Sequence, residues 1–208
     1  MLSRRSLSTI AGLGAASLLT LAAFTAQARA DAVPGQAAPA FTGMTAAGEP
    51  VSLSDFAGQT VVLEWTNQRC PYVQRHYGGN MQSLQADAAE DGVAWIQVIS
   101  SAPGEQGHVD GETALSLNDA RGARVAHTLL DPDGGIGRAY DARTTPHMYV
   151  IDGDGVLQYA GAIDDQPRPR EGDPAPTPYV EMALDALDAG ETPDPAATRP
   201  YGCSVKYG

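Results

Sequence analysis

The sequence predicts an α/β fold of three layers, with a mixed central β-sheet and helices on both of its faces. Apolar runs at 61–65 and 93–100 are rich in β-branched residues and have the length of buried strands. Segments with helical spacing separate such runs, and strands joined through helices pair in parallel. Two later apolar runs flank Gly153-Asp154-Gly155, a hairpin signal that adds antiparallel strands to the same sheet.

The helix predicted after strand 61–65 has the clearest periodicity. Steps of four, four, three and four place its apolar residues on one face: Val73, Tyr77, Met81, Leu84 and Ala88. Pro71 suits the first turn, and Gly78-Gly79 is expected to weaken or kink the helix. The other elements are predicted in chain order: an extended lead-in at 31–50, a strand and a helical turn at 51–58, a helix at 114–127, a strand at 128–131, a short helix at 136–140, strands at 148–152 and 156–162, an irregular loop at 164–178 and a helix at 179–189.

Residues 1–30 have the order of a secretory signal peptide: Arg4-Arg5, an apolar run and then Ala28-Arg29-Ala30. The apolar run is shorter than the roughly 20 residues that span a bilayer, so an uncleaved anchor is only the alternative to cleavage. Ser3-Arg4-Arg5 leaves open export by the general or by the twin-arginine route. We expect an exported protein of the bacterial periplasm or cell envelope, without stable membrane insertion after signal cleavage.

The mature chain is expected to hold one domain, residues 31–190, and a C-terminal tail, residues 191–208, that carries Cys203. Cleavage of the signal removes three arginines and no acid, which takes the net charge from −12 to −15. Such an acidic surface repels the phosphates of nucleic acids and of anionic lipids, so we expect neither class of partner.

Two cysteines, Cys70 and Cys203, are too few for a disulfide framework, and their spacing fits no zinc site. Cys70 follows a predicted strand and precedes Pro71, which opens the next helix. A thiol at that place is stabilised as a thiolate by the free N–H groups and the dipole of the helix. Arg69 and His76 would add positive charge nearby, whereas the alternative is a buried, inert cysteine.

A proline also opens the predicted strand 148–152, within Thr144-Thr145-Pro146. The strand–loop–Cys-Pro–helix segment and this later Thr-Pro pair together resemble the thioredoxin superfamily, and more narrowly its exported redoxin and peroxiredoxin-like members. The resemblance spans residues 34 to about 190 and implies a thioredoxin-like fold. It implies that Cys70 matches the first cysteine of the C-x-x-C motif and that Thr145-Pro146 match the pair around a cis peptide bond.

The same resemblance singles out Glu64, six residues before Cys70, where thioredoxins place a buried acid that assists proton transfer. Burial on the strand would raise the pKa of Glu64, which suits a base that serves a thiol. The alternative is an exposed residue at a strand edge.

The chain departs from both families that it resembles. Its motif reads C-P-Y-V, so Val73 replaces the second thioredoxin cysteine, which resolves the mixed disulfide. Peroxiredoxins carry Pro-x-x-x-Thr-x-x-Cys, whereas here Val62 or Leu63 stands at the proline position and Asn67 at the threonine position. The residues that activate peroxide are absent, so the chain is most similar to peroxiredoxin-like proteins with a single cysteine at the first C-x-x-C position.

Cys203 supplies the other thiol, within a Gly-Cys-x-x-Lys-aromatic tail similar to that of bacterial members of this peroxiredoxin-like group. Three hypotheses are open: Cys203 folds back as the resolving cysteine of Cys70, it forms a permanent disulfide with Cys70, or it stays free on a flexible tail. A permanent disulfide would close a loop of about 134 residues and stabilise the fold by roughly 5 kcal/mol, but it would remove the nucleophile.

Four residues near the motif are candidates for substrate binding: Thr145, Pro146, His147 and Tyr72. A cationic His147 would stabilise the thiolate, and a solvent-facing histidine is the alternative. Tyr72 and Trp65 would form an apolar platform for a peptide, although core packing explains both equally well. We expect no metal and no cofactor, because Cys70, His76 and His147 lack a recognised metal-ligand spacing.

The predicted function is thiol–disulfide exchange with Cys70 as the nucleophile and Cys203 as a possible second cysteine. The expected partners are protein thiols, protein disulfides or a reductant protein. The alternative enzyme is a thiol-dependent peroxidase, a peroxiredoxin-like antioxidant. The second alternative is a non-catalytic thioredoxin-fold module that binds peptides by strand pairing beside Pro146.

Overall fold

Residues 32–208 are described by a computed structural model, and the predicted signal peptide lies outside this range. The elements in chain order are β1 (Thr42–Thr45), β2 (Pro50–Ser52), the 3-10 turn η1 (Leu53–Phe56), β3 (Val61–Trp65), α1 (Pro71–His76), α2 (Asn80–Glu90), β4 (Ala94–Ile99), α3 (Gly111–Arg121), β5 (His127–Leu130), α4 (Gly135–Ala139), β6 (Thr144–Thr145), β7 (His147–Ile151), β8 (Leu157–Gly161), α5 (Tyr179–Asp188) and β9 (Cys203–Ser204). Within this part of the chain, no helix is long and apolar enough to cross a membrane.

A seven-stranded sheet runs through the molecule in the order β2-β1-β5-β4-β3-β7-β8. Its central strands β3, β4 and β5 pair in parallel, because helices connect them along the chain. The edges are antiparallel: β7 pairs with β3 and β8 on one side, and β1 pairs with β5 and β2 on the other. The predicted mixed sheet is confirmed, and β1 is an additional strand within the segment that the sequence analysis assigned to an extended lead-in.

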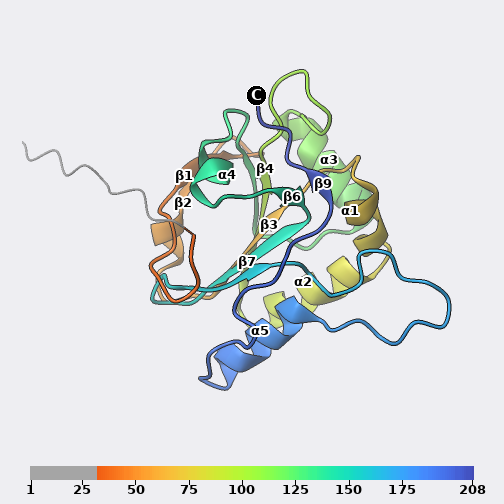
Figure 1. The fold of residues 1–208 in the computed structure, drawn as a ribbon. Coiled ribbons are helices and arrows are strands. Elements are labelled where there is room, and N and C mark those ends of the chain that lie inside the picture. Colours follow the sequence, from red (N-terminus) through yellow and green to blue (C-terminus); the bar gives the residue numbers. More distant parts are fainter. Residues whose placement is uncertain (1–31) are drawn as a thin grey trace, which may run out of the picture.

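Helices cover the two faces of the sheet unequally (Figure 1). Because side chains alternate along a strand, Val62 and Leu63 point to opposite faces. Val62 belongs to the core under α2 and α5, together with Met148 and Val150. Leu63 belongs to the core on the other face, which α4 and the N-terminal segment cover and which includes Trp65. The two cores together fix β3 from both sides, and β3 leads directly into the loop that carries Cys70.

The predicted helix 72–90 is two helices, α1 and α2, which separate at Gly78-Gly79 as expected. Gly79 has a φ of 139°, a conformation that residues with a side chain rarely adopt. The prediction 114–127 for α3 is shifted, because Asp110 caps the start of the helix and Gly122, in the left-handed conformation, ends it.

The C-terminal tail lies along the domain. Ala197 forms a bridge with Ala160, and the amide of Ala102 donates to the carbonyl of Lys206 at 2.8 Å. Between these two contacts, β9 pairs antiparallel with β6 in a separate two-stranded sheet. Figure 1 shows β9 beside β6 and near α1, although about 60 residues separate β6 from β9 in the sequence. The tail therefore holds Cys203 within an ordered strand.

Candidate functional site

The loop between β3 and α1 presents Cys70 as the N-cap residue of the helix, followed by Pro71 at the first helical position. Asn67, which is buried, shapes this loop: its carbonyl accepts from the Cys70 amide and its side-chain oxygen accepts from the Arg69 amide, both at 2.9 Å. Gly107 leaves room for it, since a Cβ there would lie 2.5 Å from the Asn67 side chain. The local sequence thus places the sulfur where a helix begins, as predicted.

The sulfur of Cys70 donates a hydrogen bond to the carbonyl oxygen of Thr145 at 2.9 Å. The Thr145–Pro146 peptide bond is cis, which confirms the conformation that the resemblance implies. Cys70 is completely buried, so the predicted nucleophile is covered in this structure.

Cys203 is brought to the same place by the pairing of β6 with β9. It lies directly opposite Thr145 in the antiparallel register, and Ser204 lies opposite Thr144. Both cysteines are free thiols. Thr145 therefore lies between the two sulfur-bearing residues, although they are 133 positions apart in the sequence.

The pKa values of the two thiols are shifted in opposite directions. Burial raises the pKa of Cys70, but hydrogen bonds from Cys203, from Thr145 and from the amide of Val73 outweigh burial and lower it below the ordinary value. Burial and the hydrogen bond to Cys70 raise the pKa of Cys203 to about 11. Cys70 is therefore the thiol of the pair that ionises first, whereas Cys203 keeps its proton to higher pH, and this asymmetry suits thiol–disulfide exchange.

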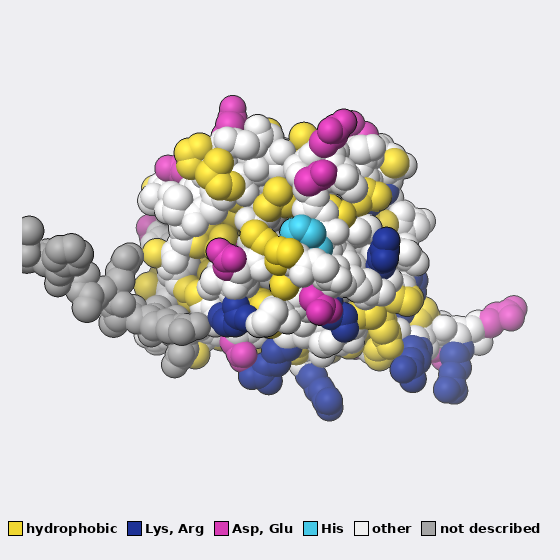
Figure 2. All heavy atoms as spheres, turned by 90° about the horizontal axis from the view of Figure 1, so that it is seen from above, with side chains coloured by type: hydrophobic (Ala, Val, Ile, Leu, Met, Phe, Trp, Pro, Cys, Tyr) yellow, Lys and Arg dark blue, Asp and Glu magenta, His cyan; other side chains and the backbone are white. Residues whose placement is uncertain are grey.

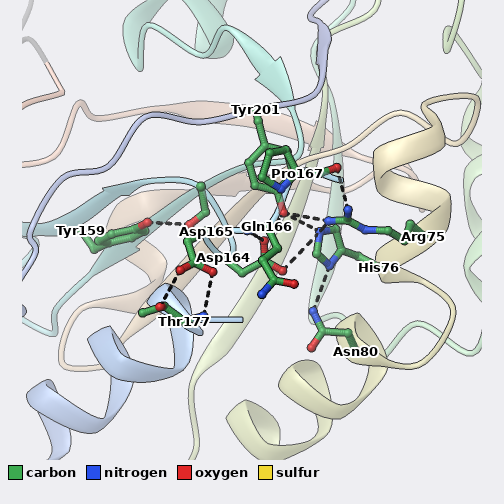
Figure 3. Close-up of polar contacts among 11 residues, drawn as sticks. Arg75, His76, Asn80, Tyr159, Asp164, Asp165, Gln166, Pro167, Thr177 and Tyr201 are labelled. Atoms are coloured by element: carbon green, nitrogen blue, oxygen red, sulfur yellow. Dashed lines mark hydrogen bonds and ion pairs between the residues drawn. The ribbon is translucent and has the colours of Figure 1, made fainter. Parts of the chain in front are cut away.

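A polar cluster holds the tail next to this pair (Figure 3). The hydroxyl of Tyr201 lies 3.0 Å from Nε2 of His76 and accepts from Nη2 of Arg75 at 3.0 Å. It donates to Oδ1 of Asp164. Arg75 and His76 come from α1, whereas Asp164 follows β8, so Tyr201 joins three segments two residues before Cys203. We refer to Arg75, His76, Asp164 and Tyr201 as the tyrosine cluster.

Glu64 is completely buried on β3, which excludes the alternative of an exposed edge residue. Its carboxylate accepts from the Tyr77 hydroxyl at 3.0 Å, from Nε1 of Trp95 at 2.9 Å and from Nε2 of Gln85 at 3.2 Å. Burial raises the pKa of Glu64. These contacts lead to the C-terminal end of α1 and not to its first residue, so a proton-transfer role towards Cys70 stays a prediction.

The predicted cationic histidine beside the thiolate is corrected. Burial lowers the pKa of His76 and of His147 to about 4, so both rings are neutral near pH 7. His76 belongs to the tyrosine cluster. His147 packs on Tyr149, with ring centres 4.5 Å apart and Nδ1 of His147 3.0 Å from the Tyr149 hydroxyl. Its side chain is buried, which excludes the solvent-facing alternative.

The two predicted platform aromatics separate in the structure. Trp65 is buried in the core, where its Nε1 donates to Oγ of Ser100 at 3.0 Å. Tyr72 is half-buried on α1, and its ring centre lies 5.8 Å from that of Tyr201. Tyr72 therefore packs on the tail, in the position that a docked peptide was expected to take.

Charge is uneven on the face of the molecule seen in Figure 2. Lys and Arg side chains gather along one edge, whereas Asp and Glu side chains are scattered over the rest, with hydrophobic side chains between them.

Among residues 32–208, no group of three or more His, Cys, Asp or Glu side chains is arranged to hold a metal ion.

Residues 34–160 match the model of the AhpC/TSA family. The chain belongs to the AhpC/TSA family. The match covers β1 to β8 and includes Cys70 and the cis Thr145–Pro146 bond, whereas the tail with Cys203 lies beyond it. A comparison with curated proteins finds no match.

Solved structures show that this AhpC/TSA protein has a thioredoxin-like fold. An uncharacterized conserved protein from Geobacillus kaustophilus is similar, with a TM-score of 0.76 at 27% identity over 85% of this chain and 93% of that one. A hypothetical protein from Sinorhizobium meliloti has a TM-score of 0.72 at 24% identity over 85% and 95% of the two chains. A putative protein disulfide isomerase from Bacteroides thetaiotaomicron shares the fold, with a TM-score of 0.54 at 19% identity over 78% and 91%.

Two residues of the site in this AhpC/TSA chain, Tyr201 and Gly202, were not predicted from the sequence. Tyr201 lies in a tail without periodicity, and its partners are at least 37 positions away in the chain. Gly202 permits a close backbone approach, because glycine has no Cβ. Its contact with Thr145 is nevertheless non-local, and no pattern within the tail indicates it.

Proposed function

We propose that this protein is an exported thiol–disulfide oxidoreductase in which Cys70 is the nucleophile and Cys203 resolves the mixed disulfide. Its partners are proteins that carry disulfides or thiols, called clients below, and a dithiol reductant. The observation that carries the proposal is the position of Cys203: it lies opposite Thr145, whose carbonyl accepts the hydrogen bond of the Cys70 sulfur. Cys203 thereby supplies the second sulfur that α1 lacks, because Val73 stands at the second cysteine position of the C-x-x-C motif.

The proposed reaction has two exchange steps. The Cys70 thiolate attacks one sulfur of a client disulfide, so that a Cys70–client bond forms and the other client sulfur leaves as a thiolate. Cys203 then loses its proton and attacks the Cys70 sulfur, so that the Cys70–Cys203 bond forms and the client leaves reduced. The client gains two electrons from the cysteine pair, one proton from Cys203 and one proton from water, and the dithiol reductant restores the pair. The same steps in reverse oxidise a client dithiol.

Membership of the AhpC/TSA family supports a second candidate, a thiol peroxidase. Cys70 would then be oxidised by a hydroperoxide to a sulfenic acid, with release of an alcohol, and Cys203 would condense with it to form the disulfide and water. Asn67 weighs against this candidate. Its amide donates to the Gln106 carbonyl at 3.2 Å and its oxygen accepts from the Arg69 amide, so both groups are already engaged.

Trapping of the mixed disulfide tests the proposal. The Cys203→Ser protein, mixed with a small protein disulfide, should accumulate a covalent adduct at Cys70 that mass spectrometry detects. The wild type should pass to the internal Cys70–Cys203 disulfide, and Cys70→Ser should form no adduct at all. Consumption of hydroperoxide by wild type at a higher rate than disulfide exchange would favour the peroxidase instead. A Cys70 that reacts with neither substrate would leave the non-catalytic binding module.

A further inference from the structure

The strand edge beside the cis-proline is already occupied by the chain's own tail. Residues 203–204 pair antiparallel with Thr144 and Thr145, as an added strand from another polypeptide would. Cys203 sits in this added strand next to the Cys70 sulfur, where the reacting cysteine of a client would have to lie. Because Cys70 is completely buried with the tail in place, a client disulfide has no access to the sulfur.

Gly202 permits this close approach. Its φ is 142°, and a Cβ built on it would lie 2.0 Å from the Thr145 carbonyl oxygen, well inside van der Waals contact. The pairing of β9 with β6 is therefore compatible only with glycine at this position.

Tyr201, the residue before Gly202, holds the tail to the domain through the tyrosine cluster (Figure 3). Its partners His76 and Asp164 are buried, with exposures of 3% and 6%. Nη1 of Arg75 also donates to the Pro167 carbonyl at 2.7 Å, which ties the cluster to the loop after β8. Hydrogen bonds of a hydroxyl to charged groups are among the stronger ones in proteins, so the half-buried side chain of Tyr201 anchors a tail segment of only a few residues.

We propose that Tyr201 is a positioning residue, whose hydroxyl holds residues 202–204 on the β6 edge and over Cys70. The tail then competes with the client for one edge: it has to leave before a client segment can pair with Thr145. Its return presents Cys203 to the Cys70–client bond and displaces the client strand at the same time. This inference rests on the proposed function for its catalytic meaning, although the covering of Cys70 by the tail can be tested without it.

Alkylation of Cys70 by iodoacetamide tests the proposal in a Cys203→Ser background, where only one thiol reacts. Tyr201→Phe keeps the ring against Tyr72 and removes only the hydroxyl. We expect it to raise the alkylation rate of Cys70 about tenfold, the lower end of what a hydrogen bond to a charged group contributes. Gly202→Ala in the same background should raise the rate at least as much, through the steric overlap with Thr145.

Tyr140→Phe is the matched control. It also removes a buried hydroxyl, which donates to the Pro39 carbonyl at 2.7 Å and has no contact with the tail. The control should leave the alkylation rate of Cys70 unchanged while lowering stability to a similar degree. Equal rates in Tyr201→Phe and its parent, or an equal rise in Tyr140→Phe, would overturn the proposal.

A second measurement separates this inference from the proposed function. With both cysteines present, Tyr201→Phe should lower the equilibrium constant for the Cys70–Cys203 disulfide against glutathione by about the same tenfold factor. If alkylation speeds up as expected but no variant exchanges disulfides with a client, the proposed function fails and the positioning role stands. If clients are reduced at the wild-type rate in Tyr201→Phe and alkylation is also unchanged, the positioning role fails and the proposed function stands.

Discussion

The two cysteines meet the same residue, Thr145, from parts of the chain that are organised in different ways. Cys70 is placed by neighbours in the sequence: β3 ends, Asn67 shapes the loop, and Pro71 begins the helix. Cys203 is placed by residues far from it, through the pairing with Thr145 and the contacts of Tyr201. A core element thus fixes one sulfur, whereas a short surface strand with few hydrogen bonds fixes the other. The difference makes Cys203 the partner that can move.

The comparison predicts that substitutions of core residues such as Glu64 lower the free energy of unfolding. Substitutions in the tail should instead change the equilibrium constant of the Cys70–Cys203 disulfide. Glu64→Ala should have the largest effect on folding, because it leaves the hydroxyl of Tyr77 and the indole N–H of Trp95 buried without their acceptor. We expect the free energy of unfolding to fall by about 3 kcal/mol or more, as measured by urea denaturation. The disulfide equilibrium with glutathione should stay unchanged, and a large change in it would show that Glu64 acts on the thiols.

Gly202→Ala should change the disulfide equilibrium with glutathione more than the free energy of unfolding. The added Cβ removes the pairing of β9 with β6. At about 1 kcal/mol per hydrogen bond, a loss of about 2 kcal/mol corresponds to about a 30-fold fall in the equilibrium constant for the Cys70–Cys203 disulfide. Redox titration against glutathione measures it. The matched control is Gly172→Ala, which also changes a left-handed glycine (φ of 87°) but meets no atom within 4 Å. An equal effect in both variants would refute the role of the tail contact.

The thiol titration sharpens the comparison further. Thiolate absorbance of the reduced wild type should rise in two separate steps, the first below the ordinary pKa of a cysteine and the second at about 11. Cys203→Ala removes the hydrogen bond that stabilises the Cys70 thiolate, so the pKa of Cys70 should rise. Cys203→Ser keeps a donor and should preserve the lowered value. A Cys70 titration that is indifferent to both substitutions would place the two thiols out of contact.

The smallest effect is expected for His147→Gln. Folding lowers the pKa of His147 to about 4, so between about pH 6.5 and pH 4 the unfolded state binds more protons than the folded state. Stability therefore falls as the pH falls through this window, and His147→Gln should flatten that fall in denaturation experiments at a series of pH values. The reactivity of Cys70 at pH 7 should not change, because the wild-type ring is already neutral there. A loss of Cys70 reactivity in His147→Gln would support a cationic His147 beside the thiolate.

Local patterns explain which parts of the fold were predictable. The apolar runs of β3 and β4, the stripe of the helix pair and the glycines at its break are all readable in the sequence, because each depends on neighbours within one element. β1 was not predicted because the sequence of Thr42–Thr45 does not alternate between apolar and polar residues. This segment is a strand through its pairing with β2 and β5, which the local sequence does not indicate.

The residues of the site also fall into two groups, those that follow from local sequence and those that depend on contacts between distant segments. Cys70, the cis Thr145–Pro146 bond and a buried Glu64 follow from motif positions, and the structure contains all three. The protonation of His147 and the anchoring by Tyr201 could not be predicted, because both depend on burial and on contacts between distant segments. The position of Cys203 was left open among three hypotheses for the same reason, and none of them included its pairing with Thr145.

Redox titration of the mature protein, with mass mapping of both cysteines, tests the central claim most directly. The account predicts a single internal disulfide between Cys70 and Cys203 that forms and breaks reversibly as the glutathione ratio changes. Two cysteines that take up glutathione separately, without ever bonding to each other, would contradict it. So would a Cys70–Cys203 bond that no dithiol reductant can open, since such a bond would be a permanent cross-link.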